Sequence, residues 1–277
     1  MQIHQDAVTG TVEVAGQDVG WHDTGVPGGP APVLLVHGTG GSAATHYRTV
    51  YPMLAARHRV LAVDLAPAAE LEDIRTQVLA VLAERAPGQA VDLVGYSLGA
   101  VAAATLAAER PDLVRNLVLV CGWARTDGVQ RLRNELWQRL FASDRESLAR
   151  FSTFVAFGQS YLRARTDAEI AQLVAARTFP DGVEESMRLN ARVDIARDLD
   201  RISAPTLVIS GLEDQMVGPH HGRFLFGGIE DARLAEIETG HAATTERPAQ
   251  VFKLIDDFLR RRPGLAPAGA LVDTVAI

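Results

Sequence analysis

The sequence predicts an α/β fold: an eight-stranded, mostly parallel sheet with helices on both faces and a helical cap inserted after the sixth strand. Short runs rich in Val, Leu and Ile alternate with helical periodicities, as they do in repeated βα units. The later runs are almost continuously apolar, which is expected of parallel strands covered on both faces. Residues 124–200 show helical periodicity without a strand pattern and are too long for a loop, so they predict the cap.

Eight strand candidates follow one another along the chain. The first two, TVEVAG and QDVGWHDTG, alternate apolar and polar residues around Gly16 and predict an antiparallel hairpin. The other six are PVLLVHG, RVLAVDL, VDLVGYS, VRNLVLVCG, APTLVISG and ARLAEIE. Helical patterns lie between them at 43–56, 70–85, 99–109, 219–226 and 246–261. This alternation predicts right-handed crossovers between parallel strands.

The chain is expected to divide into a core, a cap and a tail. The core comprises residues 1–123 and 201–262, the cap residues 124–200, and the tail residues 263–277. The cap is expected over the carboxyl ends of the strands, where α/β folds bind ligands. The tail has a linker composition, PGLAPAGA, followed by a short apolar segment that either stays flexible or docks on the body or on a partner subunit.

Composition narrows the functional class. The net charge of −7, with basic residues scattered along the chain, argues against nucleic-acid and anionic-membrane partners. Cys121 is the only cysteine, so no intramolecular disulfide or thiolate metal cluster can form. The amino terminus lacks a signal-peptide pattern, and no apolar stretch reaches the length of a membrane span. We expect a cytoplasmic protein without a cofactor or metal that binds a small-molecule substrate, with a homodimer left open.

The stretch VDLVGYSLGA places Ser97 between Gly95 and Gly99, after an apolar strand and before an alanine-rich helix. A serine in this setting predicts a nucleophile elbow, a turn so sharp that its central residue is strained. The two glycines remove the Cβ atoms that would clash as strand and helix close on each other. The G-x-S-x-G pattern alone also arises by chance, but the strand before it and the helix after it favour the elbow.

A serine nucleophile needs a base and an acid to orient that base. His241 follows the last strand, and Gly240 before it permits a tight turn that aims the ring back over the sheet. Asp214 follows the seventh strand in GLEDQMVGP and is expected to reach toward that histidine. Its neighbour Glu213 is expected to point the other way, and Asp127, after the sixth strand, is the alternative acid.

The glycine-rich stretch HGTGG leaves the third strand and predicts free backbone N–H groups. Together with the N–H of Leu98, that of Thr39 is expected to bind a developing oxyanion. A phosphate-binding loop is the alternative interpretation. It is disfavoured because neither G-x-x-x-x-G-K-[ST] nor G-x-G-x-x-G occurs here.

Aromatic residues are concentrated in and near the cap: Trp123, Trp137, Phe141, Phe151, Phe154, Phe157 and Tyr161. The spacing of three and four residues places Phe151, Phe154, Phe157 and Tyr161 along one side of a helix. That side either packs the cap against the sheet or faces the pocket. The expected pocket residues are Gly38, Tyr96, Trp123, Trp137, Phe154 and Phe157. We expect the cap arginines mostly on the outer, solvated side, and therefore a neutral, largely apolar substrate of small to medium size.

Residues 10–262 resemble the α/β-hydrolase superfamily, because they contain, in the order of that superfamily, the motifs HGTGG, GYSLG, GLEDQMVGP and ETGH. The resemblance is strongest to its small capped esterases, enol-lactonases and carbon–carbon bond hydrolases. The resemblance implies Ser97 as nucleophile, Asp214 as acid and His241 as base. Serine at 97 argues against the epoxide hydrolases and haloalkane dehalogenases of that superfamily. The sequence thus predicts a cofactor-free serine hydrolase that cleaves an ester or lactone through an acyl-enzyme. Cyclisation, carbon–carbon cleavage and a slow, receptor-like ligand-binding protein are the alternatives.

Overall fold

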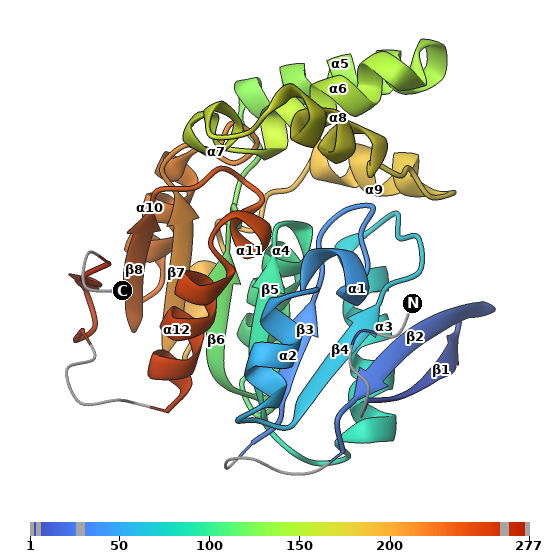
Figure 1. Cartoon of the computed structure of the whole chain (residues 1–277). Coiled ribbons are helices and arrows are strands. Elements are labelled where there is room, and N and C mark those ends of the chain that lie inside the picture. Colours follow the sequence, from blue (N-terminus) through green and yellow to red (C-terminus); the bar gives the residue numbers. More distant parts are fainter. Residues whose placement is uncertain (1–2, 4–6, 26–30, 261–265, 275–277) are drawn as a thin grey trace.

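A nine-stranded sheet runs through the centre of the molecule in the order β1-β2-β4-β3-β5-β6-β7-β8-β9 (Figure 1). The computed structural model describes residues 3, 7–25, 31–260 and 266–274. Strand β2 pairs antiparallel with β1 and β4, and all other neighbours are parallel. The strands are β1 (Val8–Val14), β2 (Gln17–Asp23), β3 (Val33–Val36), β4 (Val60–Asp64), β5 (Val91–Tyr96), β6 (Val114–Val120), β7 (Thr206–Gly211), β8 (Ala232–Ile237) and β9 (Ala270–Leu271).

Helices cover both faces of the sheet, as the apolar runs predict. One face packs against α3, α4 and α10, and the other against α1, α2 and α12. The helices of the core are α1 (Ala43–His46), α2 (Val50–Ala55), α3 (Leu71–Arg85), α4 (Leu98–Glu109), α10 (Pro219–Gly228), α11 (Ala243–Glu246) and α12 (Pro248–Leu259). The single helix expected over 43–56 is therefore two short helices.

Alternate residues of the parallel strands belong to two separate hydrophobic clusters. In β3, Leu34 and Val36 pack on the α3 and α4 side, whereas Val33 and Leu35 pack on the α2 and α12 side. This follows from the two-residue period of a strand, which sends successive side chains to opposite faces. Because both faces are covered, all four residues are apolar, and the strand cannot show the polar alternation seen in β1.

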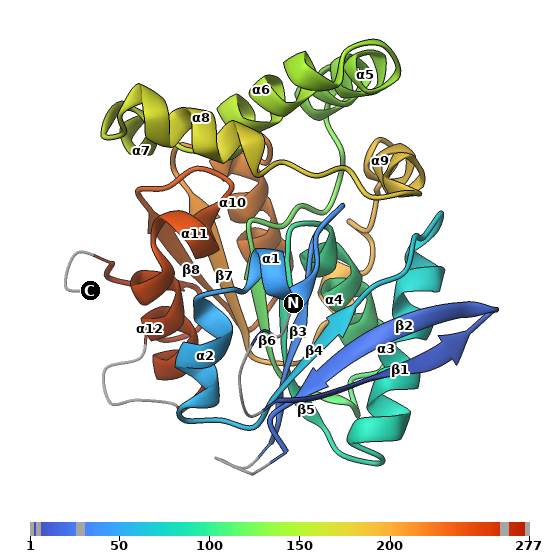
Figure 2. The same cartoon turned by 45° about the vertical axis from the view of Figure 1, so that its right-hand side comes forward.

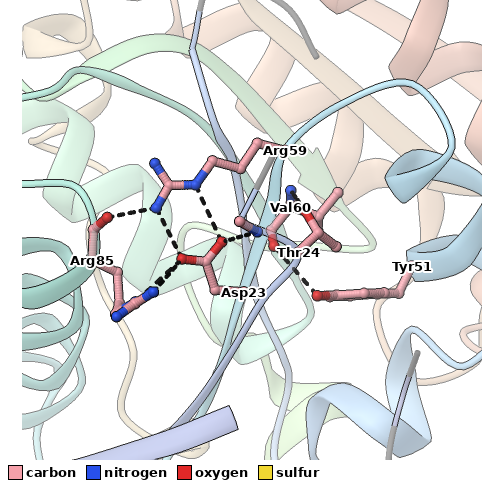
Figure 3. A network of polar contacts seen from close by, with 7 residues as sticks. Asp23, Thr24, Tyr51, Arg59, Val60 and Arg85 are labelled. Atoms are coloured by element: carbon pink, nitrogen blue, oxygen red, sulfur yellow. Dashed lines mark hydrogen bonds and ion pairs between the residues drawn. The ribbon is translucent and has the colours of Figure 1, made fainter. Parts of the chain in front are cut away.

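The carboxyl end of β2 is fixed by a buried ion-pair network (Figure 3). The carboxylate of Asp23 is fully buried and accepts hydrogen bonds from the guanidiniums of Arg59 and Arg85. Burial alone would raise the pKa of Asp23, but hydrogen bonds from Arg59, the Gly25 N–H and Arg85 outweigh it and hold that pKa below its ordinary value. The network joins β2 to the start of β4 and the end of α3.

The tail forms the ninth strand, so the expectation of eight strands is wrong by one. In β9, Ala270 and Leu271 pair in parallel with Arg233 and Leu234 of β8. The Thr274 hydroxyl also donates to the Glu236 carbonyl. The docked form of the tail is therefore the one observed over 266–274, while residues 263–265 and 275–277 lie outside the described residues.

Five helices stand over the carboxyl ends of the strands (Figure 2). They are α5 (Gly128–Ser143), α6 (Arg145–Ala156), α7 (Gln159–Arg163), α8 (Asp167–Ala175) and α9 (Val183–Asn190). Helices α5, α6 and α9 share a small apolar cluster built around Trp137, Leu148, Val183 and Met187. We call these five helices the cap. Within the described ranges, no helix is both long enough and apolar enough to cross a membrane.

Candidate active site

Ser97 sits in the strained turn that its sequence setting predicts. Its backbone has φ 57° and ψ −122°, a left-handed conformation that is uncommon for a residue with a side chain. A Cβ atom on Gly95 would lie 2.3 Å from the Gly99 carbonyl oxygen, and one on Gly99 would lie 2.2 Å from that of Val36. Both glycines are therefore required for α4 to pack this closely on β3 and β5, and the turn places Ser97 at the carboxyl edge of the sheet.

A chain of two hydrogen bonds links Ser97, His241 and Asp214. Ser97 Oγ lies 2.9 Å from His241 Nε2, and His241 Nδ1 lies 2.7 Å from Asp214 Oδ2. Asp214 Oδ1 also accepts the backbone N–H groups of Met216 and Val217 at 2.7 and 2.8 Å. Because a carboxylate only accepts, Nδ1 carries the proton and Nε2 is free to take one from the serine. The three side chains are 9%, 4% and 5% exposed, in the same order.

The two other acids considered from the sequence lie elsewhere. Asp127 caps the amino end of α5, and its Oδ2 lies 3.0 Å from His220 Nε2. Glu213 points away from His241 and accepts the N–H of Ser160 in the cap at 2.8 Å. Asp214 is thus the one of these three acids that the structure pairs with His241.

The expected oxyanion donors lie beside Ser97. Leu98 is the first residue of α4, and the N–H groups of a first helical turn have no acceptor within the helix. Thr39 lines the same cavity as Ser97. Neither N–H finds an acceptor in the part of the chain that the structure describes. A Cβ on Gly38 would lie 2.7 Å from Ser97 Cβ and 3.3 Å from its Oγ, so the loop can pass this close only with glycine there.

Two polar residues that the sequence patterns did not single out hold this loop. The N–H of Gly38 donates to His46 Nδ1 at 3.1 Å, and Asn190 Nδ2 donates to Thr39 Oγ1 at 2.9 Å. Burial lowers the pKa of His46 well below its ordinary value, so its ring is neutral and can accept. The Asn190 contact joins segments far apart in sequence, so no local pattern reveals it, whereas His46 follows the loop closely in sequence and no motif marked it.

A second acid fixes the His241 loop to the cap. Glu246 accepts the N–H of Gly240 with one oxygen and that of Gly158 with the other, each at 3.1 Å. The Tyr96 hydroxyl donates to the His241 carbonyl at 2.8 Å from the opposite side. His241 is therefore oriented by contacts to its side chain and to its backbone.

Among the described residues, two groups of three side chains bring possible metal-binding atoms within 4.8 Å of one another, namely Cys121–Asp214–His241 and Asp127–His220–His221. In the first group, burial raises the pKa of the Cys121 thiol well above its ordinary value, which disfavours the thiolate that a metal requires. Asp214 and His241 are already bound to each other there, so the group fits proton transfer better than metal binding.

A cavity of about 520 Å³ opens above Ser97 and His241, with the cap as its roof. Apolar side chains form much of its lining, among them Trp123, Trp137, Val155, Phe157, Leu173, Val183 and Met187. A depression of about 740 Å³ lies beside α10, but Ser97 and His241 are not among its lining residues. The smaller cavity is therefore the candidate active site.

The expected pocket residues divide into those that line this cavity and those that do not. Tyr96, Trp123, Trp137 and Phe157 line it, and Gly38 lies against Ser97 instead. Phe154 is 54% exposed, so its expected place in the pocket is wrong. The other face of α6, carrying Ser152, Val155 and Ala156, lies toward the cavity.

The aromatic stripe expected on a single helix is broken. Helix α6 ends at Ala156, and the chain turns at Gly158 before α7 begins. Phe157 and Tyr161 stack on each other with ring centres 5.2 Å apart, whereas Phe151 packs with the Trp137 cluster. The three-and-four spacing was therefore not the spacing of one continuous helix.

The cap arginines were expected mostly on the outer side, and two of them depart from that expectation. Arg133 and Arg177 are half-buried and line the cavity. The inference of a neutral substrate depended on that orientation, so it loses this support and stays a prediction. An apolar lining that includes cationic groups is the observed arrangement.

Comparison with known proteins agrees with this architecture. A model of the Alpha/beta hydrolase family matches residues 33–254. The chain is 29% identical over 240 residues to pyrrolizixenacetamide deacetylase from Xenorhabdus hominickii, covering 82% of this chain and 90% of that protein. It is 29% identical over 249 residues to pimeloyl-(acyl-carrier protein) methyl ester esterase from Neisseria meningitidis, covering 84% and 95%.

Among solved structures, the enol-lactonase from Burkholderia xenovorans LB400 superposes with a TM-score of 0.77 at 22% identity, covering 91% of this chain and all of that one. This likeness concerns the fold, whereas the family model matches the sequence itself over most of its length. On that match, the chain belongs to the alpha/beta hydrolase family.

Proposed function

We propose that this hydrolase cleaves a carboxylic ester or lactone through an acyl-enzyme formed on Ser97. The observation that carries the proposal is the hydrogen-bonded series Ser97–His241–Asp214 at the floor of the capped cavity. A serine hydroxyl becomes a nucleophile when a neighbouring imidazole takes its proton, and this geometry provides such an imidazole. The methyl ester esterase and the deacetylase among the relatives act, by their names, at acyl groups.

In the proposed mechanism, Ser97 Oγ attacks the substrate carbonyl carbon while its proton moves to His241 Nε2. Asp214 stabilises the imidazolium that forms and remains ionised. The N–H groups of Thr39 and Leu98 receive the carbonyl oxygen as it becomes an oxyanion, and each such donor is typically worth about 100-fold to 1000-fold in rate.

His241 then donates its proton to the leaving alcohol, and the acyl group stays on Ser97 as an ester. In the second half of the reaction, His241 takes a proton from water, and the resulting hydroxide attacks the acyl carbon. Collapse of the second tetrahedral intermediate releases the carboxylic acid and returns the proton to Ser97. Burial under the cap strengthens each of these electrostatic interactions.

Turnover of a panel of esters and lactones by the wild type and by Ser97→Ala tests the proposal. The variant is expected to lose nearly all activity, by a factor that can approach ~10⁶ in serine enzymes. Ser143→Ala is the matched control, because the hydroxyl of Ser143 is exposed and donates to its own helix at Arg139. Substantial turnover by Ser97→Ala with circular dichroism like that of the wild type would refute the assignment. A wild type that binds esters without turning them over would instead indicate the receptor-like alternative.

A further inference from the structure

Three polar groups of the cap line the cavity and each has a buried atom without a partner. Arg133 Nε, Ser152 Oγ and Arg177 Nη2 have no hydrogen-bond partner in the part of the chain that is described. Arg133 belongs to α5, Ser152 to α6, and Arg177 follows α8. Donors from three separate segments of the cap therefore border one cavity, and an unsatisfied buried donor is costly unless a ligand completes it.

The cavity is cationic although the chain is acidic. Its lining includes Arg48, Arg133 and Arg177 but no Asp or Glu, whereas the chain as a whole carries a net charge of −7. Within the described ranges, neither Arg133 nor Arg177 forms an ion pair, although exposed cap arginines such as Arg150 do. Burial lowers the pKa of both guanidiniums. Arginine remains protonated in proteins, so both bring a positive charge to the cavity without an ion-pair partner among the described residues.

The Arg177 side chain is held in place by the cap itself. Its Nε donates to Thr153 Oγ1 at 3.2 Å, and its guanidinium carbon lies 5.1 Å from the centre of the Phe157 ring. These contacts leave Nη2 for another partner. A planar guanidinium that is fixed in this way is suited to a carboxylate, which it can bind through two parallel hydrogen bonds.

We propose that Arg133, Arg177 and Ser152 form a subsite for a carboxylate carried by the substrate. The substrate class is then an ester or lactone with an apolar body and a free carboxylate remote from the bond that is cleaved. Trp123, Trp137 and Val155 receive the apolar body, and the cap donors receive the anion. This inference rests on the proposed ester hydrolysis at Ser97 for its orientation of the substrate, but binding of the anion does not require that chemistry.

The test compares monomethyl esters of linear dicarboxylic acids with matched methyl esters in which the free carboxylate is replaced by a carboxamide. A series of chain lengths finds the spacing between the cap subsite and Ser97. At the best length, the half-ester should exceed its amide counterpart by about 100-fold or more in kcat/KM, because an analogue that leaves buried polar groups unpaired is strongly rejected. Arg177→Gln and Arg133→Gln should each reduce that ratio by about tenfold or more, with Arg177→Lys retaining part of it.

Arg150→Gln is the matched control, since Arg150 is an exposed cap arginine paired with Glu146. It should keep the preference for the half-ester. If Arg177→Gln fails to fold, Arg177→Met, which keeps much of the side-chain volume, replaces it. A wild type that cleaves the amide series as well as the half-esters, or cap-arginine variants with an unchanged ratio, would overturn the subsite while leaving the serine hydrolase standing.

A binding measurement separates failure of the subsite from failure of the proposed chemistry. The matching dicarboxylate should raise the Tm of Ser97→Ala, and should raise it much less when Arg177→Gln is added. That shift does not depend on turnover. Its absence over a series of dicarboxylate concentrations up to the solubility limit would refute the subsite, even if the ester panel shows that Ser97 is the nucleophile.

Discussion

The core and the cap differ in whether their polar groups at the cavity have hydrogen-bond partners. In the core, Ser97, His241 and Asp214 complete one another, and backbone N–H groups satisfy the remaining oxygen of the acid. In the cap, Arg133, Arg177 and Ser152 line the same cavity with polar atoms that have no partner in the described chain. A self-satisfied group is ready for chemistry on any acyl carbon that reaches it, whereas an unsatisfied one favours a ligand of complementary charge.

If both proposals hold, the core performs the reaction and the cap selects the substrate. This division also separates what each substitution should change. Removal of a core group should lower turnover for every substrate, and removal of a cap donor should change the ranking among substrates. Substitutions away from the cavity should alter stability and leave both alone.

The largest expected effect is on the acid and base of the core. His241→Ala should reduce kcat/KM nearly as much as loss of the serine, and Asp214→Asn should reduce it by about 10⁴-fold, because an amide favours the wrong imidazole tautomer. Asp127→Asn is the matched control, since an asparagine can still cap α5. The measurement is kcat/KM for one well-cleaved ester, and a larger loss in Asp127→Asn than in Asp214→Asn would show that the acid has been misassigned.

The next largest effect is expected on the stability of the fold, with no change in activity. Asp23→Asn removes the carboxylate that Arg59 and Arg85 share (Figure 3), beside the amino end of β4 and away from the carboxyl edge that carries Ser97. The variant should lower the free energy of unfolding at pH 7 by roughly 3 kcal/mol. Urea titration measures this loss. The kcat of the folded variant should match that of the wild type. A fall in kcat at unchanged stability would contradict the expectation that substitutions away from the cavity alter only stability.

The same carboxylate makes a prediction about pH. Because the pKa of Asp23 is held below its ordinary value in the folded protein, the carboxylate contributes stability above the unfolded pKa of about 3.9, and that contribution is lost as the pH falls through the folded pKa. The stability difference between the wild type and Asp23→Asn should therefore shrink below about pH 4. A stability difference that stays constant down to pH 2 would show that the negative charge of Asp23 does not provide it.

A smaller effect is expected where core and cap meet. Glu246→Gln keeps one acceptor for Gly158 or Gly240 but presents an amide N–H to the other, so one hydrogen bond to a charged group is lost, at a cost of about 1.5 kcal/mol. Because this carboxylate steadies the His241 loop, we expect kcat to fall by about tenfold. Glu238→Gln, at an exposed position of the same loop, is the control. Unchanged kinetics in Glu246→Gln would show that the cap does not help to position the base.

The smallest effect is expected at the edge of the sheet. Deletion of residues 266–277 removes β9 and leaves the edge of β8 unpaired, which should lower Tm by roughly 2–4 °C for a loss of about 1 kcal/mol. The kcat should not change, because β9 pairs with Arg233 and Leu234 in the amino-terminal half of β8, whereas His241 follows the carboxyl end of that strand. An unaltered Tm would show that the pairing contributes nothing to stability.

The sequence predicted best those features that depend on neighbouring residues. The turn at Ser97 needs glycine on both sides and a strand and helix around it, and all of these lie within one short stretch. The positions after strands were informative for Asp214 and His241, because the carboxyl ends of parallel strands meet at one edge. Such features are read from spacing alone.

The features that the sequence missed depend on how separate elements meet. The contact of Asn190 with Thr39 joins the end of the cap to the loop after β3, and the pairing of β9 with β8 joins the tail to the core. The orientations of Phe154 and Arg177 depend on how the cap helices are rotated and on where they break. Gly158, which follows the end of α6, was a local signal for the end of that helix, and the prediction from periodicity did not take it into account.

The measurement that tests the central claim most directly is covalent trapping of the nucleophile. The wild type is treated with a fluorophosphonate, digested, and mapped by mass spectrometry, with Ser97→Ala and the cap variant Arg177→Gln treated in parallel. If the core performs the chemistry, the adduct forms on Ser97 in the wild type and in Arg177→Gln, and Ser97→Ala carries none. An adduct on another residue, or labelling of Ser97→Ala to the same extent as the wild type, would contradict the account.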